Sequence, residues 1–142
     1  MFRIRALILF APLALVGCGR DASQVPPPPP APPPNKIDIS HPITARGTEP
    51  FWALTIEGTR LTLTRPEQPP LVGTAPKADV EPGKVRWKAA TDANHAFTVT
   101  LYSSYCSDGM SDIRYPFNAE VDIGTRVLHG CAAKAADLNK KH

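Results

Sequence analysis

The sequence contains no run of lysine or arginine residues and no basic stripe interleaved with aromatic side chains. Proteins that bind nucleic acid need such a surface to meet the phosphate backbone. Two of the 16 basic residues, Arg3 and Arg5, lie in an N-terminal segment that we expect to be removed, as argued below. The rest of the chain then has 14 basic residues against 13 acidic ones. The composition therefore gives no support for a nucleic-acid partner.

Catalytic motifs are absent as well. The sequence has no Gly-x-Ser-x-Gly elbow, no His-Glu-x-x-His pair and no glycine-rich phosphate loop. The four histidines are scattered, at positions 41, 95, 129 and 142. A triad can assemble from residues far apart in a sequence, but no pattern points to one. We therefore expect no enzyme activity, no catalytic residue and no cofactor.

Long hydrophobic runs are also missing. The longest, residues 6–17, holds about a dozen residues, whereas a helix that spans a bilayer needs about 20. A short apolar run that follows Arg3 and Arg5 is instead typical of an export signal. The run ends in Leu15-Val16-Gly17-Cys18, which resembles the lipobox of bacterial lipoproteins.

This resemblance implies that residues 1–17 are a signal peptide and that Cys18 is the first residue of the mature protein. The Cys18 sulfur would carry a diacylglycerol and its amine a third acyl chain, and two or more chains hold a protein stably on a membrane. The residue after the cysteine is Gly19 rather than an aspartate. In this respect the sequence resembles Gram-negative lipoproteins that are sorted to the outer membrane instead of being retained at the inner one. An ordinary secretory signal, with Cys18 merely near the cut, is the alternative.

Proline is abundant where the signal ends, since eight of the 17 prolines lie in residues 26–34. Such a run adopts polyproline II and makes neither helix nor sheet hydrogen bonds. We predict that residues 18–36 are a lipidated cysteine followed by a disordered, semi-rigid stalk. Its residues 19–36 would reach on the order of 55 Å if fully extended, at about 3.1 Å per residue. A ligand for a proline-binding module is the alternative. Residues 37–142 are enough for one domain.

Cysteine is rare, with three in the chain. If Cys18 carries lipid, Cys106 and Cys131 remain as an even pair in an oxidising compartment, and we predict a disulfide between them. Closing this loop would stabilise the fold by about 3–4 kcal/mol. Zinc ligation by Cys106, His129 and Cys131 is the alternative, although His-x-Cys is an unusual spacing and a fourth ligand is missing.

Apolar and polar residues alternate with a period of two over much of the domain, which predicts β-strands. The alternation is clearest in a hairpin of residues 51–64 with a turn at Gly58-Thr59, which prolines 66, 69 and 70 are expected to end. Further strands are predicted at 71–73, 85–89, 96–103, 114–123 and 126–131. About six to eight short strands indicate an all-β fold, a small antiparallel β-barrel or sandwich. Residues 132–138 have helix-forming composition but are too short to be stable unless they dock.

Four short motifs carry a family resemblance: RGTEPFW at 46–52, YCSDGMSD at 105–112, YP at 115–116 and GCA at 130–132. The combination resembles a family of small bacterial envelope proteins, often lipoproteins, catalogued as uncharacterised membrane proteins. That family brings no established catalytic residues, so the resemblance implies a location but no site. The layout of anchor, spacer and β-rich domain is also similar to HslJ-type heat-shock envelope proteins and to lipoprotein inhibitors of lysozyme.

Residues 108–112 allow two interpretations. Asp108 and Asp112 could present carboxylates to a hard cation such as calcium, although the segment is far shorter than an EF-hand and lacks its closing glutamate. The alternative is a turn at Asp108-Gly109, with Ser111 or Asp112 satisfying nearby backbone N–H groups. We expect the turn, and no metal site.

The aromatic pair at the start of the hairpin suggests a binding surface. Trp52 is in phase with the apolar residues that follow it, so we predict that it lies in the core. Phe51 falls on the opposite face, where a large aromatic side chain beside Glu49 could contribute to binding. Packing against the stalk or the C-terminal tail is the alternative. We take Glu49, Phe51, Asp108 and Asp112 as the candidate binding surface.

These features together predict a lipoprotein held by Cys18 at the outer membrane and facing the periplasm, acting as a non-enzymatic binding or structural module of the cell envelope. Its expected partners are the membrane, through the lipid, and an envelope protein. A lysozyme-inhibitor-like protein is the alternative, although such proteins reach an acidic cleft with basic residues or serine and this loop is acidic. An envelope hydrolase would need His41, His95 or His129 beside a nucleophile in a cleft.

Overall fold

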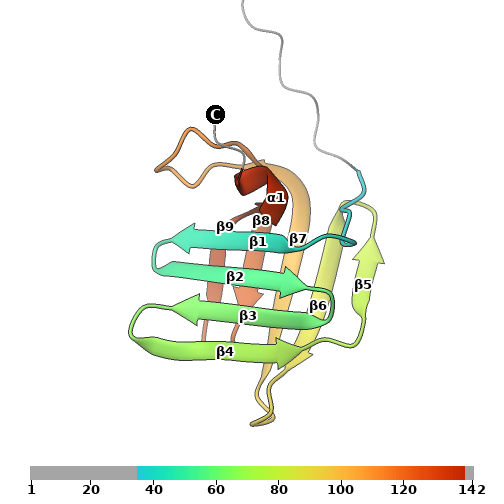
Figure 1. The fold of residues 1–142 in the computed structure, drawn as a ribbon, viewed down its shortest axis with the longest axis vertical. Coiled ribbons are helices and arrows are strands. Elements are labelled where there is room, and N and C mark those ends of the chain that lie inside the picture. The colour runs from blue at the N-terminus through green and yellow to red at the C-terminus, as the bar shows by residue number, and fades with distance from the viewer. Residues whose placement is uncertain (1–34, 140–142) are drawn as a thin grey trace, which may run out of the picture. The chain divides into compact units, whose positions relative to one another are not determined.

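A computed structural model of the chain describes residues 35–139 (Figure 1). The expected signal peptide, the lipidated Cys18 and all but the last two residues of the proline-rich stalk lie outside these residues and stay predictions. The described elements are β1 (Ile43–Thr48), β2 (Phe51–Glu57), β3 (Arg60–Arg65), β4 (Gln68–Thr74), β5 (Ala78–Glu81), β6 (Lys84–Ala90), β7 (Ala96–Cys106), β8 (Tyr115–Asp122), β9 (Val127–Lys134) and α1 (Ala135–Leu138).

The strands form one antiparallel sheet that closes on itself. Their order is β4-β3-β2-β1-β9-β8-β7-β6-β5, and a pairing of Thr74 on β4 with Ala90 on β6 joins eight of them into a barrel. In Figure 1, β1 to β4 face the viewer and β7 to β9 cross behind them. The fifth strand pairs with β6 outside the ring. The all-β prediction is confirmed, and of its two architectures the barrel is the one that forms.

Side chains fill the inside of the barrel. Inward positions alternate with outward ones along each strand, as in β2, where Trp52, Leu54 and Ile56 are buried. They meet large residues from the opposite wall, among them Trp87, Phe97, Leu101, Phe117 and Val121. A barrel of this size is just wide enough for such a core. The filled interior therefore leaves the outer face and the loops as the surfaces on which another molecule can be bound.

Two glycines let Trp52 lie across neighbouring strands. Gly47 on β1 is the pairing partner of Trp52, and Gly130 lies on β9. A Cβ atom on Gly47 would collide with the indole ring, and one on Gly130 would collide with the backbone of Arg46. The indole Nε1 donates a hydrogen bond to the His129 carbonyl oxygen at 3.3 Å. The prediction that Trp52 lies in the core is confirmed.

Several details differ from the sequence pattern. Strand β4 contains Pro69 and Pro70, which were expected to end the hairpin. They are tolerated because the β3–β4 register shifts between Leu63 and Arg65, and prolines are found at such irregularities. Residues 132–134 continue β9, so the helix is only α1, and its Leu138 packs against buried Tyr115. The described residues hold nine strands, whereas about six to eight were predicted. The two strands that the sequence pattern did not predict are β1 and β5.

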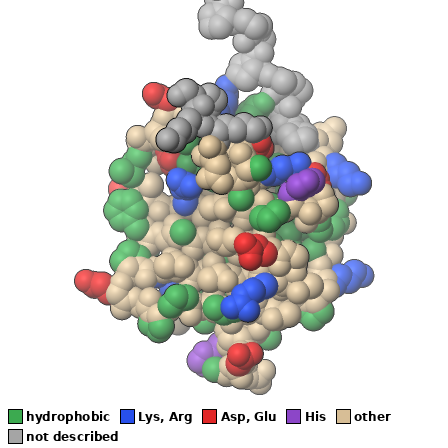
Figure 2. Space-filling model, in the orientation of Figure 1, with side chains coloured by type: hydrophobic (Ala, Val, Ile, Leu, Met, Phe, Trp, Pro, Cys, Tyr) green, Lys and Arg blue, Asp and Glu red, His purple; other side chains and the backbone are tan. Residues whose placement is uncertain are grey.

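Charged side chains of both signs are interspersed on the face shown in Figure 2, rather than gathered in a patch of one sign. Hydrophobic side chains lie along one edge of this face, on the side of the β1–β2 turn. Within residues 35–139, no helix is long and apolar enough to cross a membrane.

Candidate functional site

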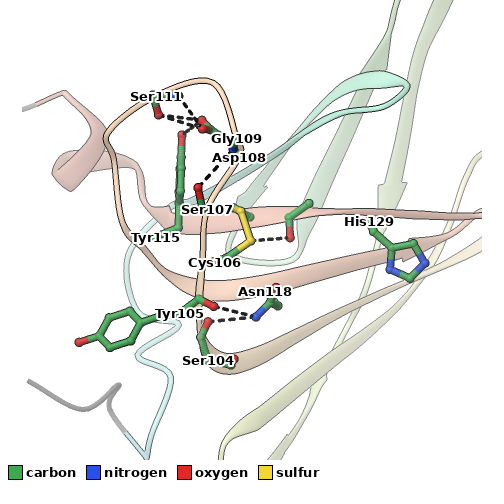
Figure 3. The surroundings of a disulfide bond; sticks show 12 residues. Ser104, Tyr105, Cys106, Ser107, Asp108, Gly109, Ser111, Tyr115, Asn118 and His129 are labelled. Atoms are coloured by element: carbon green, nitrogen blue, oxygen red, sulfur yellow. Dashed lines mark hydrogen bonds between the residues drawn. A yellow bond between two sulfur atoms is a disulfide. The ribbon is translucent and has the colours of Figure 1, made fainter. Parts of the chain in front are cut away.

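A disulfide joins Cys106, at the end of β7, to Cys131 on β9 (Figure 3). The two Cα atoms are 5.4 Å apart, although β8 lies between the two strands in the sheet. Cys106 reaches β9 because the β7–β8 register shifts after Ser103. Its sulfur lies 3.4 Å from the Gly130 carbonyl oxygen, a contact only, since a disulfide sulfur has no hydrogen to donate. The predicted disulfide is confirmed, and zinc ligation by these sulfurs is wrong.

The loop of residues 107–114 is organised by the carboxylate of Asp108 (Figure 3). One oxygen accepts hydrogen bonds from the backbone N–H groups of Met110, at 3.0 Å, and Ser111, at 2.8 Å. The other accepts one from the Tyr115 hydroxyl at 2.9 Å, and the Ser111 hydroxyl also donates to this carboxylate. The backbone N–H of Ser111, followed by that of Met110, holds the pKa of Asp108 well below its usual range. The segment is a loop held by local side-chain hydrogen bonds, as the turn interpretation expected, but Asp108 rather than Asp112 accepts the backbone N–H groups, and Ser111 accepts one from Ile113 at 3.4 Å.

Beneath this loop lies a small cluster on the outside of the barrel. Buried Tyr115 packs there with Cys131 and Ala133, and Leu138 of α1 covers the cluster. Burial, and secondly the hydrogen bond to Asp108, raise the pKa of the Tyr115 hydroxyl. The disulfide and the Tyr115–Asp108 hydrogen bond thus fasten the loop to the barrel wall, which positions its exposed residues.

A first hollow, which we call the polar hollow, has a volume of about 570 Å³ on the outer face of β7, β8, β9 and β1. Its polar lining includes Arg46, Glu49, Tyr102, Asn118, Glu120 and His129. Glu120 accepts a hydrogen bond from the Tyr102 hydroxyl at 3.0 Å and lies 3.7 Å from His129 Nδ1. The hydrogen bond to Glu120 raises the pKa of Tyr102. These three residues come from three neighbouring strands.

A second hollow, which we call the apolar hollow, lies on the other side of β1 and has a volume of about 610 Å³. Its lining includes Arg46, Phe51, Ala53, Arg65, Pro66 and Met110. The side chain of Phe51 is 57% exposed and that of Met110 is 71% exposed. The Nε atom of Arg65 is buried without a hydrogen-bond partner in the described part of the chain. Because more than half of its surface is exposed, Phe51 can contact another molecule.

The structure divides the candidate residues among three places. Glu49 lines the polar hollow, Phe51 lines the apolar hollow, and Asp108 lies at the boundary of both. Asp112 instead lines a separate hollow beside α1 with Ile113. No cluster of three or more possible metal-ligating side chains is found among the described residues.

The sequence reasoning missed three residues of this surface. Arg46 and Met110 lie inside the motifs at 46–52 and 105–112, so the motifs contained the only signal for them. Arg65 comes from β3, and it reaches the same hollow because Ala53 pairs with Thr64 across the hairpin. Such a position follows from strand register and could not be read from sequence spacing.

No family model, curated protein or solved structure matches this chain. The resemblance to small envelope proteins accordingly stays a prediction drawn from short motifs.

Proposed function

We propose that the protein is a lipoprotein of the outer membrane, facing the periplasm, whose barrel is a non-enzymatic binding module of the cell envelope. The observation that carries the proposal is the exposure of Phe51 and Met110 around one hollow. Single exposed apolar side chains are ordinary, but a group of them around a concave surface marks a binding site. Aromatic residues, methionine and arginine are also the residues enriched at protein interfaces.

The chemistry of the polar side chains agrees with binding rather than with catalysis. Asp108 has its carboxylate oxygens engaged by its own loop, so it serves the architecture of the surface. The lipid anchor is supported by the sequence around Cys18. An oxidising compartment is supported by the Cys106–Cys131 disulfide, since such bonds persist outside the cytosol.

Crosslinking in intact cells tests the proposal. The protein is expressed at native level with a photoreactive side chain in place of Ala53, which lies in the apolar hollow, and crosslinked partners are identified. We expect one dominant partner, lost when Phe51→Ser and Met110→Ser are introduced together. Val80→Ser is the matched control, because Val80 is 52% exposed on β5. A crosslinking pattern that is the same in all variants would count against a binding module at this surface.

A further inference from the structure

We infer that the apolar hollow binds a protein segment in which a large apolar side chain is flanked by acidic residues. This inference rests on the proposed function and names the chemistry of the partner. It combines three features of the hollow, namely its exposed apolar side chains, its two arginines and the engagement of its own acidic residue. Each feature constrains a different part of the bound segment.

The two arginines bring positive charge to the hollow, and Arg46 also lines the polar hollow, where Glu49 and Glu120 lie. Arg46 and Arg65 both line the hollow. No ion pair joins either guanidinium to a carboxylate within residues 35–139. Arg65 in addition leaves its buried Nε donor without a partner in that part of the chain, and an unsatisfied buried donor is energetically unfavourable. A carboxylate brought by a partner can pair with guanidinium groups in a bidentate manner.

The acidic side chain next to the hollow does not supply this partner. Asp108 is the only carboxylate among the described lining residues. Its oxygens accept hydrogen bonds from Met110, Ser111 and Tyr115. Turning Asp108 toward the arginines would break the loop that presents Met110. With two arginines against one aspartate, the lining of the hollow has a positive excess, which favours an acidic partner, and Arg65 is the arginine that the polar hollow does not share.

The apolar part of the hollow fits a large hydrophobic side chain. Phe51 and Met110 expose most of their surface beside Pro66. A methionine adapts its shape to different apolar groups, and a hollow of about 610 Å³ lies within the range of sites for small groups, about 300–1,000 Å³. Burying such a side chain removes apolar surface of both molecules from water.

A protein segment fits this site better than a lipid. Sites for small apolar ligands enclose most of the ligand surface, whereas Phe51 and Met110 remain largely open to solvent. Phenylalanine, methionine and arginine are among the residues enriched at protein interfaces, where arginine and aromatic residues carry much of the binding energy. Arginine also forms planar, paired hydrogen bonds with carboxylates, which gives orientation as well as attraction.

Peptide binding to the purified full-length protein tests the inference. The probes are short capped synthetic peptides with a central Phe-Leu pair flanked by glutamate, by glutamine or by lysine, and binding is followed by fluorescence anisotropy. We expect the glutamate peptide to bind most tightly and to weaken as salt is added, because salt screens exposed charges. Arg46→Gln with Arg65→Gln should weaken it by about tenfold or more, equivalent to about 1.4 kcal/mol.

Matched variants separate this effect from unfolding. Arg126→Gln removes an exposed arginine from the β8–β9 turn and should leave the affinity unchanged. Arg46→Lys with Arg65→Lys keeps the charge and should keep the salt dependence. Melting temperatures identify any variant that loses the fold, and the salt dependence of the unaltered protein is informative without any variant.

Three outcomes would overturn the inference. The first is equal binding of the three peptides, and the second is acidic-peptide binding that is indifferent to salt and to both arginines. The third is arginine-dependent binding to phosphatidylglycerol vesicles without binding to peptides, which would assign the site to lipid. If in-cell crosslinking still depends on Phe51 and Met110 while these peptides fail, the binding module stands and only the acidic chemistry is wrong.

Discussion

At the scale of single residues, Trp52 shows how a core side chain constrains its neighbours. Its ring occupies the space left by the missing side chains of Gly47 and Gly130, and its Nε1 binds the His129 carbonyl oxygen. The strand that carries His129 and the strand that carries Arg46 are thus fixed against the same indole. The two sides of the polar hollow depend on this contact for their spacing.

Gly130→Ala should therefore destabilise the fold. The added Cβ would meet the backbone of Arg46 rather than a flexible side chain, and overpacking of this kind costs about 1–3 kcal/mol. Chemical denaturation gives the free energy of unfolding. Thr48→Ala, on the same face of the barrel as the outward Arg46, is the control and should change it little. Equal stability of the Gly130→Ala variant and the unaltered protein would contradict the packing described.

Asp108 predicts a specific dependence of stability on pH. Its pKa in the folded state lies below the ordinary value, about 3.9 in an unfolded chain. Ionised Asp108 therefore stabilises the fold above about pH 4, and this contribution is lost as the pH falls through that range and below. Asp108→Asn should lower the melting temperature at pH 7, because an amide nitrogen cannot accept hydrogen bonds from Ser111 or Tyr115.

Melting temperatures from pH 7 down to about pH 2 test this expectation. The difference between the unaltered protein and Asp108→Asn should shrink as the acid is protonated. Asp38 also has a lowered pKa, mainly through its hydrogen bond to Lys134, but it is present in both proteins and cancels in the comparison. A difference that stays constant over the whole range would mean that Asp108 does not act through its charge.

At the scale of strands and loops, sequence periodicity was informative where inward residues are large. The hairpin of β2 and β3 and the long β7 were predicted because their inward positions hold residues such as Leu54, Leu63 and Leu101. Strand β1 was missed because, apart from Ile43 at its start, its inward positions hold the small residues Ala45 and Gly47, which give little hydrophobic signal. Strand β5 has four residues, and none of them is buried.

The candidate site was predictable only in part, because most of its residues are brought together by strand register and by the conformation of a loop. Phe51 followed from its phase relative to Trp52. The surface around it depends on the β2–β3 register, which brings in Arg65, and on the fold of the 107–114 loop, which brings in Met110. Asp112 was grouped with Asp108 by proximity in sequence, but it lines another hollow.

The disulfide should account for a large part of the stability of the 107–114 loop and the strands beside it. Cys106 and Cys131 are separated by 25 positions, and a bond across such a loop contributes about 3.5 kcal/mol by restricting the unfolded chain. The double variant Cys106→Ala with Cys131→Ala should lose a comparable free energy of unfolding. Reductant should lower the stability of the unaltered protein and leave the variant unchanged. Insensitivity of both proteins to reductant would contradict the expectation.

At the scale of the whole molecule, the anchor predicted at Cys18 can be tested independently of the barrel. The purified protein should have the mass of residues 18–142 plus a diacylglyceryl group and one further acyl chain, and cells given a palmitate analogue should label it. Cys18→Ser should abolish the label because the serine hydroxyl does not replace the thioether, while the melting temperature of the barrel stays the same. Cleavage at another bond, with an unmodified Cys18, would indicate an ordinary secretory signal.

The position of β1 in the sheet has a mechanical consequence. It is hydrogen-bonded to β2 on one side and to β9 on the other, and the chain enters it from residues 35–42, where Asp38 binds Lys134 Nζ at 2.6 Å. Arg46 and Phe51 lie toward its opposite end. A pull between the N-terminal segment and a bound partner would run along this strand and load both ladders in shear, so their hydrogen bonds would have to fail together. The barrel can thereby carry tension without unzipping.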